Sequence, residues 1–429
     1  MRTAPCRGVV APRNLTFRDS QRAGSGPATA ANRTDPQLND PTRQRRTADT
    51  LAATFSMVTT ATTPFLVGTM GTGIGADLGM TVPALAGVIS FGYLIASVLS
   101  PLGGRLTQRI GAPNSLRLAG GLTSLGVALA ALASSSAQLW AAFTAIGLAN
   151  AVIQPASNGT LSGITTGRAQ GLLFGLVQSA VPTATLLAGL LLAALNDVEL
   201  WRRALWTLFA LSLVPQLLIA RRRADEESCP TTCFVPAKGA ASSTLWLLLV
   251  GAFLGSASST VVAVFGVASG MAGGLSPTAA ASGQMLGSLC CIVGRITSAW
   301  RWGQHRPMRL LRYVAMLQAL GVAGVGLLAV LSAPAYFVGF AVAFGCGWGW
   351  TGLQNLALVR GWPDSAARVT GVIQSGLFAG SVVGPVVFGG IVSSQSYSAA
   401  WGTAALTMAL AASSTLSASL RLGKPAPAH

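Results

Sequence analysis

The uncharged stretches of this chain are long, and they limit the folds it can adopt. From residue 50 onward, the runs without any Asp, Glu, Lys or Arg are 50–76, 78–104, 118–167, 169–196, 204–220, 239–294, 313–359 and 369–420. A helix that crosses a bilayer needs about 20 apolar residues. Only 9% of the residues are charged and the mean hydropathy is +0.58. The sequence therefore predicts an integral membrane protein rather than a soluble domain.

Four of these runs are about twice as long as a single membrane span, and each has turn-forming residues near its middle. These turns lie at 134–136, 273–277, 332–334 and 393–396, where Ser, Gly and Pro gather. Each long run therefore predicts two spans, and each shorter run predicts one. The expected fold is an all-α membrane protein of twelve transmembrane helices, arranged as two pseudo-symmetric halves of six.

The basic residues predict how the chain is oriented. If residues 1–50 are cytoplasmic, alternating spans place all 28 Lys and Arg on that side except Arg202 and Arg203, which leaves 26. Basic residues near span ends are retained in the cytoplasm. We expect a multi-pass protein of the cytoplasmic (inner) membrane with both termini cytoplasmic. The formal net charge of +17 then reflects topology and does not point to nucleic acid.

The charge pattern also divides the chain into segments. We predict a disordered, Arg-rich cytoplasmic segment at 1–50, a six-helix bundle at 51–220, a cytoplasmic linker at 221–243, a second bundle at 244–420 and a cytoplasmic tail at 421–429. An arm that binds nucleic acid or anionic lipid is an alternative for 1–50. Because this segment has one aromatic residue for stacking, we favour a solvated tail.

A basic stretch bracketed by glycine follows the second predicted span. It runs from Gly104 to Gly111 and contains Arg105, Gln108 and Arg109. We interpret it as a cytoplasmic loop that takes part in gating.

A second basic stretch, from Gly294 to Gly303, repeats the Gly-Arg opening with Arg295 and ends on a similar Arg-x-Gly. We predict that it is the equivalent loop of the second half. Gln154 and Gln354 also match at an offset of 200 residues, which supports an internal duplication. In the eleventh span, Gly384 and Pro385 predict close packing and a bend, and we assign them to gating.

A stripe of amides marks the candidate substrate site. Asn150, Gln154 and Asn158 recur every four residues and so lie on one helix face, which lipid would reject. Interhelical hydrogen bonding is the structural alternative to a polar cavity. The remaining residues that we predict to contact substrate are Gln178, Trp350, Gln354, Asn355 and Gln374.

The Gly104 stretch resembles the loop between spans 2 and 3 of the major facilitator superfamily. Gly104, Leu106, Arg109 and Gly111 match its pattern, while Gln108 stands where that family has an acidic residue. The resemblance implies two rocking halves around a central site. The run from Gln178 to Pro182 is similar to permeases of the cyanate and organic-anion type.

The chemistry that the predicted spans contain limits the function. They hold no Asp, Glu, Lys, Arg or His, which argues against a buried proton carrier and favours a neutral substrate, although Arg105 or Arg295 could serve an anion. Enzymatic, metal and cofactor readings fail for lack of residues, since the histidines are His305 and His429 alone.

We therefore predict a secondary active or facilitative transporter for a small solute that works as a monomer in the lipid bilayer. Two alternatives remain. One is a membrane receptor or sensor on the same scaffold that does not transport, and the other is a proton-coupled drug exporter.

Overall fold

The computed structural model describes residues 41–162, 167–195, 200–223 and 242–422, and these residues are almost entirely helical. The helices of the first half are α1 (Pro41–Thr69), α2 (Gly71–Leu78), α3 (Val82–Ile110), α4 (Ala112–Ala131), α5 (Ser136–Ser162), α6 (Gly167–Gln178), α7 (Ala180–Leu195) and α8 (Trp201–Arg223). Those of the second half are α9 (Ser242–Ala272), α10 (Pro277–Trp302), α11 (Pro307–Leu328), α12 (Ala333–Gly345), α13 (Thr351–Gly361), α14 (Ala366–Ser394) and α15 (Tyr397–Leu422), with the 3-10 turn η2 (Pro363–Ser365) before α14.

Local sequence sets where these helices begin and end. Thr81 and Ser276 accept hydrogen bonds from the backbone N–H groups of Ala84 and Ala279, so they cap α3 and α10, and each cap is followed by proline in the first turn. Gly111 has a φ of 82° between α3 and α4, a backbone conformation that favours glycine.

The helices form twelve membrane spans, as the sequence predicts. Within the described ranges, nine segments are long and apolar enough to cross a membrane. Two spans are broken: α6 and α7 together make the fifth, and α12 and α13 make the tenth, with a break at 346–350. Breaks of this kind free backbone carbonyls inside the membrane, where another group must satisfy them.

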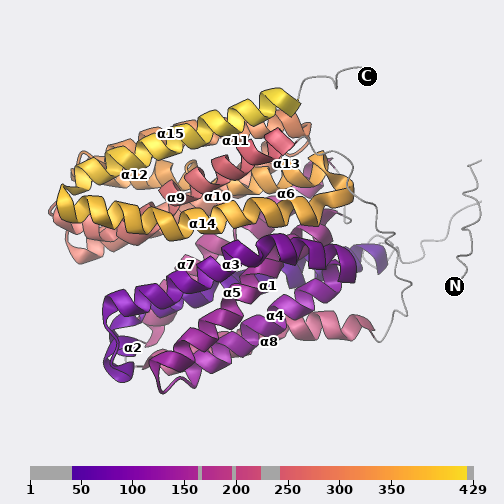
Figure 1. Cartoon of the computed structure of the whole chain (residues 1–429), viewed down its shortest axis with the longest axis horizontal. Helices are drawn as coiled ribbons and strands as arrows, with labels where there is room; N and C mark the ends of the chain where they lie inside the picture. The colour runs from indigo at the N-terminus through magenta and orange to yellow at the C-terminus, as the bar shows by residue number, and fades with distance from the viewer. Residues whose placement is uncertain (1–40, 163–166, 196–199, 224–241, 423–429) are drawn as a thin grey trace, which may run out of the picture.

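The twelve spans are arranged as two halves that lie side by side (Figure 1). The first half contains α1 to α8 and the second contains α9 to α15. The helix ends that carry Arg105, Arg168, Arg301, Arg368 and Arg421 all lie at one end of the bundle, which we call the basic end.

The apolar core differs between the two ends of the bundle. At the basic end, one core includes residues of both halves, such as Val152, Phe174, Leu310 and Leu356. At the opposite end, the buried residues form one cluster within the first half and another within the second. Partly buried Phe65 and Val181 of the first half pack against the second cluster. The halves are therefore joined most extensively at the basic end.

The two predicted glycine-bracketed loops are wrong as loops. Gly104 to Ile110 form the last turns of α3, and Gly294 to Trp302 form the last turns of α10. Charged residues end an uncharged run without ending a helix, because a long arginine side chain can extend from a helix toward a polar environment.

The segment boundaries are only partly within the described residues. Helix α1 begins at Pro41, inside the predicted 1–50 segment. Most of the predicted linker, 224–241, and residues 423–429 of the predicted tail lie outside the described residues, as does 1–40.

Candidate functional site

Helices α3 and α14 cross closely between the two halves at the basic end. A Cβ added to Gly371 would lie 3.0 Å from Cα of Gly104 and nearer still to the carbonyl oxygen of Ser100. A Cβ added to Gly104 would lie 2.5 Å from the carbonyl oxygen of Ala367. Only glycine allows the backbones to approach this closely.

A second crossing, between α6 and α10, repeats this arrangement. A Cβ added to Gly171 would lie 2.7 Å from Cα of Gly303 and nearer still to the carbonyl oxygen of Ala299. Gly171 and Gly303 thus take the places of Gly371 and Gly104. The predicted equivalence of Gly104 with Gly294 is therefore wrong in register, because helix packing, and not the shared Gly-Arg pair, fixes the structural repeat.

Hydrogen bonds extend the α3–α14 contact along both helices. Oγ of Ser97 donates to the carbonyl oxygen of Ser375 at 2.8 Å, and Nε2 of Gln108 lies 3.4 Å from the carbonyl oxygen of Asp364. Gln108 thus contacts the other half without an ion pair. Arg105 and Arg109, which we predict to be gating residues, are exposed at the end of α3.

Arg360 at the end of α13 makes several contacts across the α6–α10 side of the interface. Its Nε donates to Oε1 of Gln170 at 2.9 Å, and its terminal nitrogens donate to the carbonyl oxygens of Gly167 at 2.7 Å, of His305 at 3.2 Å and of Gly303. Sequence reasoning treated Arg360 only as a topology marker. The position of Arg360 directly after the long uncharged run 313–359 was the available signal that it lies at the end of a span and could bond neighbouring helices.

Three of the amides that we predict to contact substrate form a hydrogen-bonded network across the interface between the two halves. Nδ2 of Asn158 in α5 donates to Oδ1 of Asn355 in α13 at 2.8 Å and to Oγ1 of Thr370 in α14 at 3.1 Å. Nε2 of Gln178 at the end of α6 lies 3.4 Å from Oδ1 of Asn158. The sequence reasoning missed Thr370, although it lies four residues before Gln374 on the same face of α14.

The remaining amides lie deeper in the bundle, farther from the basic end. Asn150 and Gln154 precede Asn158 by two turns and one turn of α5, and Gln374 follows Thr370 by one turn of α14. Their side chains are buried, with exposed fractions of 9%, 8% and 5%. Nδ2 of Asn150 donates to the carbonyl oxygen of residue 146 in its own helix.

Gln154 and Gln354 each have a polar atom without a partner. Nε2 of Gln154 and Oε1 of Gln354 are buried and make no hydrogen bond within the described residues. One is a donor and the other an acceptor, and buried polar groups are normally paired. These two atoms therefore have unused hydrogen-bonding capacity.

Trp350 does not belong to this group of amides. It is 1% exposed, its Nε1 donates to the carbonyl oxygen of Gly347 at 2.8 Å, and its ring lies against Gly255 of α9. A Cβ added to Gly255 would also approach the amide of Gln318 in α11. Trp350 thus packs inside the second half.

Three of the predicted gating residues also lie inside the second half. A Cβ added to Gly294 would lie 2.6 Å from the carbonyl oxygen of Gly345 in α12, and Gly384 packs against Ala257 of α9. Pro385 lies within α14, next to Gly384. These residues allow close packing between helices of one half, and they are not at the crossings between halves.

Arg295 lies inside the bundle, so the prediction that no ionisable residue falls within a span is wrong. The prediction ended the eighth span at Gly294, whereas α10 continues to Trp302. Arg295 is 1% exposed. Its terminal nitrogens donate to the carbonyl oxygen of Gln178, at the α6–α7 break, and to that of Trp348, in the α12–α13 break, at 2.9 Å.

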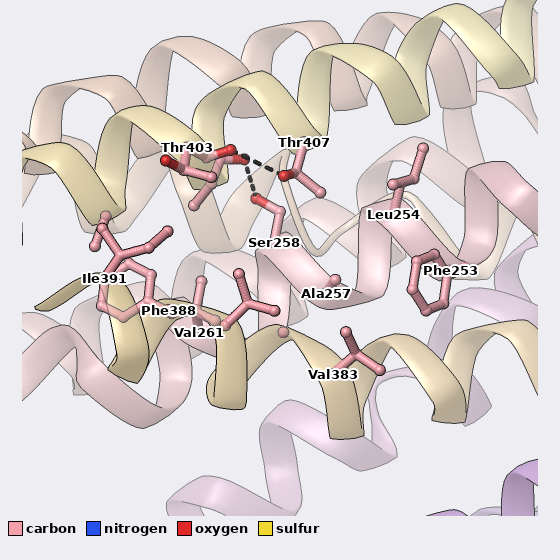
Figure 2. Close-up of a pocket in the computed structure, with 14 residues that line it drawn as sticks. Phe253, Leu254, Ala257, Ser258, Val261, Val383, Phe388, Ile391, Thr403 and Thr407 are labelled. Carbon is pink, nitrogen blue, oxygen red and sulfur yellow. Dashed lines mark hydrogen bonds between the residues drawn. The ribbon is translucent and has the colours of Figure 1, made fainter. Parts of the chain in front are cut away.

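A cavity of about 160 Å³ lies elsewhere, between α9, α14 and α15 (Figure 2). Its walls are mainly apolar. The hydroxyls of Ser258, Thr403 and Thr407 donate to backbone carbonyls at 2.9–3.0 Å. The cavity lies within one half and offers few free polar groups, so it does not suit recognition of a polar solute that crosses between the halves.

Comparison with solved structures identifies the same architecture in known transporters. The crystal structure of the human organic anion transporter MFSD10 (TETRAN) superposes with a TM-score of 0.69 at 17% identity, covering 88% of this chain and 100% of that one. The transporter FucP in its outward conformation gives a TM-score of 0.62 at 15% identity, covering 85% and 98%. A variant of the E. coli fucose:proton symporter FucP gives 0.64 at 13% identity, covering 88% and 99%.

Comparison of sequences assigns the family. No curated protein sequence matches the chain. The family model described as Major Facilitator Superfamily matches residues 50–385, which is well over half of the chain. This multi-pass membrane protein therefore belongs to the Major Facilitator Superfamily of transporters.

Proposed function

We propose that this protein moves a small solute across the cytoplasmic membrane by alternating access, in which two rigid halves rock about a central site. The observation that carries the proposal is the unequal joining of the halves. One shared core and two glycine crossings close the basic end, while the opposite end has a separate core in each half. A transporter that opens to one side at a time requires such an asymmetry.

The arrangement of charges supports an orientation. Lys and Arg are retained on the cytoplasmic side of membrane proteins. The basic end is then cytoplasmic, and the conformation described above is closed toward the cytoplasm.

We assign the solute site to the deeper amides and the gate to the network nearer the basic end. Gln154 and Gln354 offer an unpaired donor and acceptor to a solute. Asn158 and Asn355 are bonded to each other, and Asn158 lies one turn nearer the end of α5 than Gln154, so this pair closes the path to the cytoplasm. We infer that one chain contains the complete path and that the protein works as a monomer.

The mode of coupling follows from what the helices lack. The acidic residues within the described ranges are Asp49, in the part of α1 before its membrane-spanning segment, Asp77 at the end of α2, and Asp364 just before α14. Since none of the described residues places a carboxylate or histidine at mid-membrane depth, a proton has no carrier among them. We propose facilitated diffusion or solute exchange in preference to proton-coupled drug export.

The test is saturable counterflow in liposomes that contain the purified protein. Candidate solutes are first selected by their ability to raise its melting temperature, because a ligand that binds only the folded state stabilises it. Gln154→Ala and Gln354→Ala are expected to abolish counterflow without loss of folded protein. Gln138→Ala is the matched control, since Gln138 is an exposed glutamine at the opposite end.

The receptor alternative predicts a different result. A solute that binds and stabilises the protein, but is never exchanged across the liposome membrane, would favour a receptor or sensor over a transporter.

A further inference from the structure

Arg295 carries an inference about the class of solute, which rests on the proposed transport function. It is the only Lys or Arg among the buried residues that the structure describes. A guanidinium has five N–H donors and stays protonated in proteins. Two backbone carbonyls accept hydrogen bonds from its terminal nitrogens, while its Nε is buried without a partner in the described part of the chain.

The positive charge of Arg295 is not balanced by any carboxylate that the structure describes. Asp77 is paired with Arg202 at the opposite end. Asp364 is exposed at the basic end, and Asp49 lies near the start of α1. Backbone carbonyls orient a guanidinium but do not neutralise it. A buried charge without a counter-ion is costly, and such residues are retained mainly where they serve function.

The position of Arg295 places this charge beside the proposed solute path. Its two carbonyl partners belong to different halves, Gln178 to the first and Trp348 to the second. The side-chain amide of Gln178 lies 3.4 Å from Oδ1 of Asn158 in the polar network. Arg295 and the amide network therefore adjoin through a single residue, at the interface that must open and close during transport.

We propose that the solute is a small monocarboxylate and that Arg295 binds its carboxylate. A guanidinium matches the geometry of a carboxylate. One negative charge would balance the one buried positive charge, whereas a neutral solute would leave it uncompensated. The neutral amides Gln154 and Gln354 would then contact the uncharged remainder of the solute. This replaces the neutral substrate that the sequence predicts.

The test uses pairs of probes that differ only in charge. Melting of the purified full-length protein in detergent is followed against benzoate and benzamide, and against lactate and lactamide. The carboxylates are expected to raise the melting temperature in a saturable way, and the amides are not. Arg295→Gln, which keeps a donor for one carbonyl but loses the charge, is expected to weaken carboxylate binding at least 10-fold. Arg295→Lys should retain part of the response.

Arg309→Gln is the matched control, because Arg309 is exposed at the basic end, near the start of α11, and it should respond as the unmodified protein does. Equal stabilisation by both members of a pair, a response that survives Arg295→Gln, or no response to any carboxylate would each contradict the proposal. Counterflow separates this inference from the proposed function. If liposomes exchange the amide of a pair but not the corresponding carboxylate, the anion site is contradicted and the transport function is not. If a carboxylate binds in an Arg295-dependent way but is not exchanged, the transport function is contradicted and the anion site is not.

Discussion

The side chain of Asn158 donates to Oδ1 of Asn355 at 2.8 Å, and this hydrogen bond joins the two halves of the protein. Asn158 is fully buried and also donates to Thr370 of the second half. Both acceptors lose this donor when the halves separate at the basic end. Water can then replace it, which it cannot do in the closed conformation.

Replacing Asn158 by leucine should therefore favour the conformation that is open at the basic end. Unpaired buried acceptors cost about 1–3 kcal/mol, which corresponds to a shift of roughly 5- to 150-fold in the ratio of the two conformations. Disulfide formation between Ser97→Cys and Ser375→Cys reports closure and should decrease. Asn114→Leu is the control, since Nδ2 of Asn114 donates to the carbonyl oxygen of Ile110 in the same half. Unchanged cross-linking in Asn158→Leu would contradict a role of this hydrogen-bond network in gating.

Gly371→Ala should prevent the α3–α14 crossing from closing. The added methyl group would overlap the backbone of Ser100 and Gly104, and overpacking of this kind costs about 1–3 kcal/mol. Labelling of the basic end by a membrane-impermeant thiol reagent, at Thr107→Cys, should become faster. Gly390→Ala in the same helix meets no atom within 4 Å and should leave the labelling rate unchanged.

Arg360→Lys should weaken closure on the α6–α10 side although it preserves the charge. A lysine ammonium cannot reproduce the planar fork that reaches Gln170 and three carbonyl groups. We expect a loss of about 1–3 kcal/mol from the closed state. Exchange of backbone amide hydrogens in 167–175 should accelerate. The same change at exposed Arg368 is the comparison, and equal exchange in both variants would contradict a role for Arg360 in closure.

Trp350→Ala should lower the melting temperature of the protein, and not only its affinity for the solute. Removing a large buried aromatic side chain costs about 3–5 kcal/mol. Gln354→Ala, four residues away on the neighbouring turn, should leave the melting temperature nearly unchanged and weaken solute binding. Measurement of both quantities on both variants separates a core residue from a contact residue. A Trp350→Ala protein that melts normally but loses binding would restore Trp350 to the site.

Sequence reasoning recovered the number of spans, because it depends on charge and hydropathy summed over long stretches. It recovered the family through the resemblance of Gly104, Leu106, Arg109 and Gly111 to a known loop pattern. It also singled out Asn158, Gln178 and Asn355, since amides within apolar runs stand out, and the structure joins them in one hydrogen-bonded network; their contact with a solute stays a prediction. It could not place Arg295, because an arginine next to a long apolar run looks like the end of a span. The depth of Arg295 depends on how far α10 continues, and capping and packing decide that. The packing of Trp350 against Gly255 was hidden for a related reason, since a sequence does not show which face of a broken helix turns inward.

The register of the repeat was similarly hidden. Gly104 and Gly294 both precede arginine, yet Gly303 occupies the place equivalent to Gly104. Only the approach of one backbone to another distinguishes these glycines, and that approach depends on helices far apart in sequence.

The division of the apolar core also implies an order of assembly during synthesis. The buried residues of each cluster at the opposite end come from one half, so the first cluster can form before α9 has been made. The shared core includes Ala418 near the end of α15 and Ala52 near the start of α1. It is complete only when the last helix has entered the membrane. Ribosome-bound chains that stop before α15 are therefore expected to have a folded first half and an unsealed basic end.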